Sequence, residues 1–291
     1  MHMRKNIASS NSGIQASVGK FLVNRLIPNH YVDGVGPFVF LDRLYPYTQK
    51  PGTAKKPNGD FAHPHRGIAT FSYVFSGELE HYDSRGHHDV VAAGGAQWMK
   101  AGNGIVHDEQ VSAHLQETGG TLHSLQFWIN LPAANKKETP AYRGLQPDEV
   151  PEVDLPGLAG SLRVLIGEYE GKSSPIEMYS GQFNYHVKLQ PGASTTIAIK
   201  AGWESAAFVP TREVLINGEA FNNSELISFN DEGTEITLEN RGTEVADILL
   251  FGGERYEEPI FAEGPFVMNS RQEIAQAYAD FFNQKYGEIV Y

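Results

Sequence analysis

Residues that interrupt regular secondary structure recur throughout this sequence, and the apolar runs between them are short. The chain contains 30 glycines and 16 prolines among 291 residues. Between them, apolar and polar side chains alternate, as in Thr70–Phe75 and in Leu122–Leu131, where Leu125, Phe127 and Ile129 share one face. Short alternating segments separated by turn residues are typical of an all-β sandwich or barrel, which is the fold class we predict.

The second half of the chain shows the same pattern of short alternating segments separated by turn residues. Phe183–Leu189 alternates, a Pro191-Gly192 turn follows, and Thr195–Ile199 is another predicted strand. Further predicted strands are Glu213–Ile216, Leu226–Phe229, Glu235–Leu238 and Val245–Phe251.

Residues 133–160 separate the two halves, because prolines and charges are frequent there and no hydrophobic period is sustained. We therefore expect an N-terminal domain over residues 1–132, a linker over 133–160 and a C-terminal domain over 161–291.

One helix is predicted, close to the end of the chain. Ser270 and Glu273 have the spacing of a capping box, and Gly287 is expected to end the helix. The apolar residues that follow the box at helical spacing are Ile274, Ala277, Tyr278 and Phe281. This apolar stripe predicts that the helix packs on the β core.

Composition excludes several classes of function. The 23 lysines and arginines against 35 aspartates and glutamates give a net charge of −12, whereas nucleic-acid-binding surfaces are basic. The chain has no cysteine, which excludes disulfides, thiolate catalysis and cysteine-held metals. The longest apolar run, Ile248–Phe251, is too short for a membrane span, and the N-terminus lacks the apolar stretch of a secretory signal. We expect a cytoplasmic protein that binds neither membranes nor nucleic acid.

Two pairs of potential metal ligands share one spacing. In an extended strand, residues two apart point to the same side, so His63 and His65 share a face, as do His107 and Glu109, while Asp108 points away. If the two strands are neighbours inside a barrel, three nitrogens and one oxygen converge into a metal site with open positions. A single His-x-His pair is more often a surface pair than a site, but two such pairs in strand context favour metal binding.

The ligand types leave the metal open. Imidazole with carboxylate suits Fe, Ni, Cu, Mn, Co or Zn, and a structural zinc site is disfavoured because such sites are mostly thiolate-rich.

Longer motifs around these pairs resemble the pirin family of the cupin superfamily. The resemblance is carried by His63–Gly67, Asp83–Gly86, Gln97–Glu109 and Leu125–Pro132, and it extends to Gly36–Asp42 and Gly264–Asn269. It implies a bicupin, which is two tandem cupin β-barrels of the jelly-roll type, here with a short C-terminal helix. It also implies one mononuclear metal in the N-terminal barrel, held by His63, His65, His107 and Glu109.

The sequence departs from the general cupin pattern at one position. Many cupins carry a glutamate a few residues after His-x-His, whereas this chain has Ala69. In pirin-like sites the ligating carboxylate comes from the second motif, here Glu109, so the change is expected to alter the surroundings of the ligands rather than remove one.

The resemblance implies two functions of different classes. One is a quercetin 2,3-dioxygenase-like activity, in which O2 opens the ring of a flavonol and carbon monoxide is released. For this activity Fe(II) is the favoured metal, ahead of Ni, Mn, Co, Cu or Zn. Glu109 is then either the base that accepts the flavonol proton or a fixed metal ligand. The alternative is a non-enzymatic, metal-dependent, redox-sensing regulator that binds transcription or metabolic proteins.

Two further expectations concern the surroundings of the site. Trp98, Met99 and Phe127 either line an aromatic substrate pocket or, more often for such residues on strands, form core. The C-terminal domain is expected to be metal-free, because His186 is the single histidine after Pro132 and Lys188 shares its face.

Overall fold

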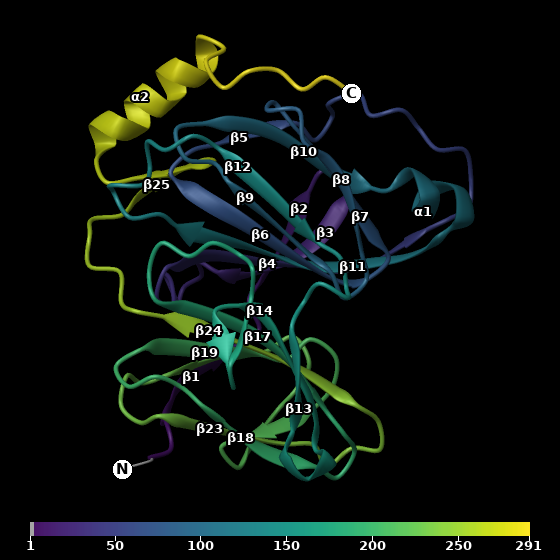
Figure 1. Cartoon of the computed structure of the whole chain (residues 1–291), viewed down its shortest axis with the longest axis vertical. Coiled ribbons are helices and arrows are strands. Elements are labelled where there is room, and N and C mark those ends of the chain that lie inside the picture. The colour runs from purple at the N-terminus through teal and green to yellow at the C-terminus, as the bar shows by residue number, and fades with distance from the viewer. Residues whose placement is uncertain (1–2) are drawn as a thin grey trace. The chain divides into compact units, whose positions relative to one another are not determined.

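The computed structural model describes residues 3–291 and consists mainly of β-strands, which confirms the predicted all-β class. The chain divides into two compact units (Figure 1). The histidine unit comprises Gln15–Val23, Phe40–Glu149 and Glu257–Tyr291. The second unit comprises residues 3–14, Asn24–Val39 and Val150–Tyr256. Within residues 3–291, no helix is both long enough and apolar enough to span a membrane.

Two antiparallel sheets form most of the histidine unit. The larger sheet has the order β12 (Ala141–Leu145), β9 (Ala96–Lys100), β6 (Ile68–Ser76), β11 (Gly120–Asn130), β4 (Phe38–Gln49), β3 (Phe21–Ile27) and β2 (Ile14–Val18). The smaller sheet has the order β5 (His63–His65), β10 (Ile105–Val111), β7 (Glu78–Asp83) and β8 (His88–Ala92). A short helix that was not predicted, α1 (Ala113–Thr118), joins β10 to β11 and is capped by Ser112.

The apolar core of the histidine unit lies between its two sheets. Phe21, Val74 and Leu122 from the larger sheet form one buried cluster with Leu79 and Val111 from the smaller sheet. Alternation along each strand therefore buries one face of each sheet against the other, as in a jelly roll.

The second unit has the same design. Its larger sheet has the order β1 (Ile7–Asn11), β22 (Leu226–Phe229), β19 (Glu204–Phe208), β24 (Ala246–Gly253), β17 (Gln182–Leu189), β14 (Gly160–Ile166) and β13 (Glu152–Leu155). Its smaller sheet has the order β18 (Ser194–Ala198), β23 (Glu235–Glu239), β20 (Val214–Ile216) and β21 (Glu219–Phe221). Small pairs add β15 (Glu168–Tyr169) with β16 (Lys172–Ser173), and η1 (Pro156–Leu158) is a 3-10 turn. A single apolar cluster joins the larger and the smaller sheet of this unit, with Val187 and Ile248 on one side and Ile197 and Ile236 on the other.

The predicted C-terminal helix is present as α2 (Arg271–Phe282), next to the hairpin of β25 (Phe261–Glu263) and β26 (Phe266–Met268). The Ser270 side chain accepts a hydrogen bond from the Glu273 backbone N–H, as a capping box requires. The helix ends at Phe282, before Gly287. Its buried Ile274 and Ala277 pack with β26 and Tyr286, in a cluster that Val106 of β10 also contacts.

The predicted domain boundaries differ from the compact units in two ways. Strand β1 pairs with β22, so residues 3–14 belong to the second unit, and Glu257–Tyr291 returns to the histidine unit. Residues 133–160 are not a free connection, because β12 pairs with β9 and β13 pairs with β14. Each unit is built from three separate segments of the chain. Composition and proline content can indicate a boundary between neighbouring segments, but they cannot indicate that distant segments belong to the same unit.

Candidate metal centre

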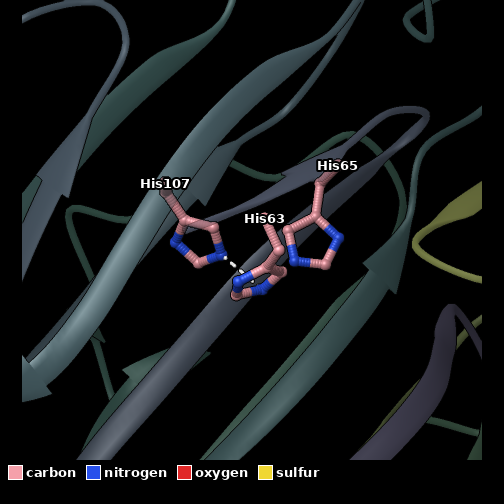
Figure 2. A group of neighbouring side chains, drawn as sticks. All are labelled: His63, His65 and His107. Carbon is pink, nitrogen blue, oxygen red and sulfur yellow. Dashed lines mark hydrogen bonds between the residues drawn. The ribbon is translucent and has the colours of Figure 1, made fainter. Parts of the chain in front are cut away.

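Strands β5 and β10 bring the two histidine-bearing motifs together. They pair antiparallel, so that His107 lies opposite His63 and Ile105 lies opposite His65. The ring centroids are 4.4 Å apart for His63 and His107, 4.8 Å for His63 and His65, and 5.0 Å for His65 and His107. Figure 2 shows the three imidazoles gathered at one place, and one ligand nitrogen from each lies within 4.8 Å of the others.

Backbone carbonyls fix which nitrogens are available. The Nδ1 of His63 lies 2.7 Å from the Phe61 carbonyl oxygen, and the Nδ1 of His65 lies 3.1 Å from that of Pro265. In the neutral rings these Nδ1–H groups donate to the carbonyls, which leaves a lone pair rather than a proton on both Nε2 atoms. The Nε2 atoms of His63 and His107 are 3.0 Å apart.

The group suits a mononuclear metal. The Nε2 of His65 and the Nδ1 of His107 are buried and have no hydrogen-bond partner within the chain. Buried polar atoms are nearly always paired, so the unpaired Nε2 of His65 beside two other imidazoles indicates a ligand that the chain itself does not supply. Histidines that donate their other N–H to a carbonyl are typical metal ligands.

Burial also keeps two of these rings unprotonated. His65 and His107 are 1% and 0% exposed. Burial, with a further contribution from the neighbouring His63, holds the pKa of both rings well below the ordinary histidine value. Because only the neutral ring can bind a metal, these two residues are ready for coordination at neutral pH.

Glu109 lies in a different group from His63 and His65. Its carboxylate forms a ligand-spaced group with His107 and His81. It accepts hydrogen bonds from the Ser72 hydroxyl at 3.1 Å and from the side-chain amides of Gln97 and Gln126. In this conformation Glu109 is therefore bound by three donors of the chain.

His81 is not among the four ligands that the sequence predicts, but it lies in a ligand-spaced group with His107 and Glu109. It is 1% exposed, and its Nε2 lies 3.2 Å from Asp83 Oδ2. Its ring stacks on Tyr142 with a centroid distance of 4.3 Å. His81 lies directly opposite Glu109 in the β7–β10 pairing, a neighbour relation that no motif in the sequence reveals.

A cavity of about 150 Å³ opens onto both parts of the site. His63, Glu109 and Gln126 form part of its polar lining. Its apolar lining consists of Val18, Phe21, Val23, Leu44, Phe61, Leu79 and Leu122. Trp98, Met99 and Phe127 do not line it and are buried, so the core interpretation of these three residues holds.

The comparisons with known proteins agree with this architecture. The Pirin family profile matches residues 20–129, and the profile of the pirin C-terminal cupin domain matches residues 184–287. A Pseudomonas aeruginosa protein provisionally named quercetin 2,3-dioxygenase is 34% identical over 252 residues, covering 87% of each chain. Human pirin is 32% identical over 269 residues, covering 91% of this chain and 88% of its own.

Among solved structures, a quercetin 2,3-dioxygenase from Acinetobacter baumannii superimposes with a TM-score of 0.91 at 30% identity. The match covers 99% of this chain and all of that one. Two cupin domains, the two family profiles and near-complete alignment to relatives above 30% identity lead to one conclusion. This chain belongs to the pirin family of the cupin superfamily.

Proposed function

We propose that this protein is a metal-dependent dioxygenase that opens the ring of flavonols with O2 and releases carbon monoxide. The observation that carries the proposal is the cavity, because its largely apolar wall reaches both His63 of the histidine cluster and the carboxylate of Glu109. The names of the Pseudomonas and Acinetobacter relatives point to the same reaction.

In this proposal His63, His65 and His107 hold one divalent metal, with Glu109 as an exchangeable fourth ligand. Fe(II) is the favoured ion, and Ni, Mn, Co, Cu and Zn suit the same ligand types. A bound divalent metal supplies a Lewis-acidic centre that favours the deprotonated form of a flavonol hydroxyl.

The residues of the chain supply the rest of the chemistry. Phe21 and Phe61, whose ring centroids are 5.7 Å apart, offer aromatic surface to a flat substrate and exclude water from the cavity. Glu109 lines the same cavity, so its carboxylate accepts the proton of the flavonol hydroxyl. Gln126 and Ser72, which both line the cavity and hydrogen-bond Glu109, orient the carboxylate for this step.

The test is oxygen uptake and carbon monoxide release with several flavonols, using protein loaded separately with Fe(II), Ni(II), Mn(II) and Co(II). Loaded wild-type protein should consume O2 and form carbon monoxide in equal amounts, while metal-stripped protein and the His63→Ala variant should not. Glu109→Gln, which keeps the side-chain shape without the base, should lower turnover. If the loaded protein consumes no more O2 than the controls, the activity is absent and the regulatory function remains.

A further inference from the structure

Three polar side chains, two of them buried and one half-buried, form a row across the larger sheet of the histidine unit. Ser72 on β6 lies opposite Gln97 on β9 and opposite Gln126 on β11, so the three are direct cross-strand neighbours. Ser72 and Gln97 are 2% and 3% exposed. Residues paired in register share one face of a sheet, so the row presents its donors together.

All three donors converge on one carboxylate from the smaller sheet. Ser72 and Gln97 donate to Oε1 of Glu109, and Gln126 donates to Oε2. An oxygen that accepts two hydrogen bonds has both of its lone pairs in use, so Oε1 has no lone pair left for a metal in this conformation. Hydrogen bonds to a charged acceptor are among the stronger ones in proteins.

The orientation of one amide is itself fixed. The Tyr142 hydroxyl has two acceptors within reach, Oε1 of Gln97 at 3.1 Å and Oδ2 of Asp89 at 3.3 Å. By donating to the nearer Oε1 it turns Nε2 of Gln97 toward Glu109. Tyr142 lies on β12, and its ring stacks on His81. Tyr142 therefore holds Gln97 in the orientation in which its amide N–H groups can donate to a carboxylate.

We propose that Ser72, Gln97 and Gln126 are positioning residues that form a second binding position for the Glu109 carboxylate, so that Glu109 exchanges between this donor row and the metal. This inference rests on the metal centre of the proposed function. It predicts that removing a donor increases metal affinity, because donors that hold Glu109 away from the metal compete with metal binding. A ligand that is available only part of the time weakens the observed affinity by that fraction.

The experiment measures Kd for Ni(II) and Co(II) by calorimetry with the full-length protein. Ser72→Ala, Gln97→Met and Gln126→Met each remove one donor with little change of volume, and each should tighten binding by about threefold to tenfold. Ser124→Ala is the matched control, since Ser124 lines the same cavity and is not bonded to Glu109, and it should leave Kd unchanged. Tyr142→Phe, which releases the Gln97 amide and keeps the ring stack, should act in the same direction as Gln97→Met.

A double-mutant cycle separates this role from a merely structural one. In a Glu109→Gln background, Gln126→Met should no longer change Kd, because the group that it acts through is gone. The visible absorption of the Co(II) protein, which reports coordination number and geometry, should differ between wild type and Gln126→Met and should be identical in the Glu109→Gln background.

The outcomes are distinct for the two proposals. Weaker binding by tenfold or more in the three donor variants would show that the row supports Glu109 as a ligand, as outer residues commonly do, and would overturn the exchange. An unchanged Kd in all three would overturn it as well. His63→Ala tests the centre itself: if that variant still binds the metal with wild-type affinity, the proposed metal site is wrong and the row has no role toward it.

Discussion

His65 has one ring nitrogen held by the Pro265 carbonyl and the other buried without a partner in the chain. His63 is held in the same way by Phe61, whereas the Nδ1 of His107 is itself buried and unpaired. At the residue scale, three histidines alone do not make the site. The backbone carbonyls of Phe61 and Pro265 also matter, because they determine which nitrogen His63 and His65 can offer to a metal.

Removing one of the three rings should abolish tight metal binding. His107→Ala is expected to weaken metal affinity by more than about 100-fold, since changes to outer residues alone commonly cost 10- to 100-fold. Metal content by elemental analysis after native purification, with the fold checked by circular dichroism, measures the effect. His114→Ala, at an exposed histidine on α1, is the control. Undiminished metal in a folded His107→Ala protein would contradict the assignment.

Metal binding should weaken in acid. Ligation needs neutral imidazoles, so protons compete with the metal as the pH falls, although burial lowers the pKa of His65 and His107 and delays this competition. Affinity measured by competition with a chelator between pH 8 and pH 5 should decline toward the acid end. A profile that stays flat even when the titration is extended well below pH 5, where the delayed competition must appear, would be incompatible with histidine ligation.

The metal-free protein should also lose stability in acid. With a folded pKa below the unfolded value of about 6.5, the unfolded chain binds protons that the folded chain does not, so the free energy of unfolding falls as pH drops below about 6.5. Urea unfolding at pH 7.5 and 5.5 measures this. The decline should be smaller in the double variant His65→Gln/His107→Gln, and an equal decline in both proteins would refute the linkage.

At the element scale, the three-residue strand β5 depends on a segment from the end of the chain. Arg66, directly after β5, forms a β-bridge with Phe266, and its guanidinium lies 2.7 Å from Asp280 of α2. Buried Lys136 donates to the carbonyls of Gly67 and Val267. The hairpin of β25 and β26 is therefore fixed against β5, next to the Pro265 carbonyl that orients His65.

A side chain at Gly67 should disturb this contact. Gly67 has φ +81°, and a Cβ there would lie 2.0 Å from the Val267 carbonyl oxygen. Gly67→Ala should destabilise the protein by more than the roughly 1–2 kcal/mol of a left-handed alanine, and it should also weaken metal affinity. Gly86→Ala is the matched control, because Gly86 has φ +86° and open space around its Cβ. Equal thermal unfolding of the two variants would show that the close contact is unimportant.

At the scale of the whole molecule, only the histidine unit carries ligand groups of the kind described above among residues 3–291. In the second unit, His186 is buried and its Nε2 lies 2.9 Å from Asp247 Oδ1. Its pKa is lowered by burial and by the charges of Lys188 and Arg163, although Asp247 opposes the shift. These cationic neighbours disfavour a metal ion at His186.

The whole chain should therefore bind about one transition metal, as the count of nitrogen ligands requires. Titration with Ni(II) or Co(II), followed by elemental analysis, gives the stoichiometry. His63→Ala should reduce the tightly bound metal to near zero. A second equivalent that persists in His63→Ala would show a site outside the three-histidine group.

The sequence by itself determined the strand-rich class, the capped final helix and the face that each site residue shares with its partner two positions away. These features are local: a period of two, a turn residue or a capping box acts over a few residues, so it can be read from the chain. The resemblance carried by the motifs around His63 and His107 also gave the family.

The tertiary structure decided everything that depends on which strands are neighbours. The period of a strand states which residues share a face and leaves its partner open, so neither His81 opposite Glu109 nor the row of Ser72, Gln97 and Gln126 could be predicted. The exchange of terminal segments between the units and the Pro265 carbonyl behind His65 join residues about 200 positions apart. Such contacts form when distant segments pack together, and a pattern that spans a few residues carries no information about which distant segment will be the neighbour.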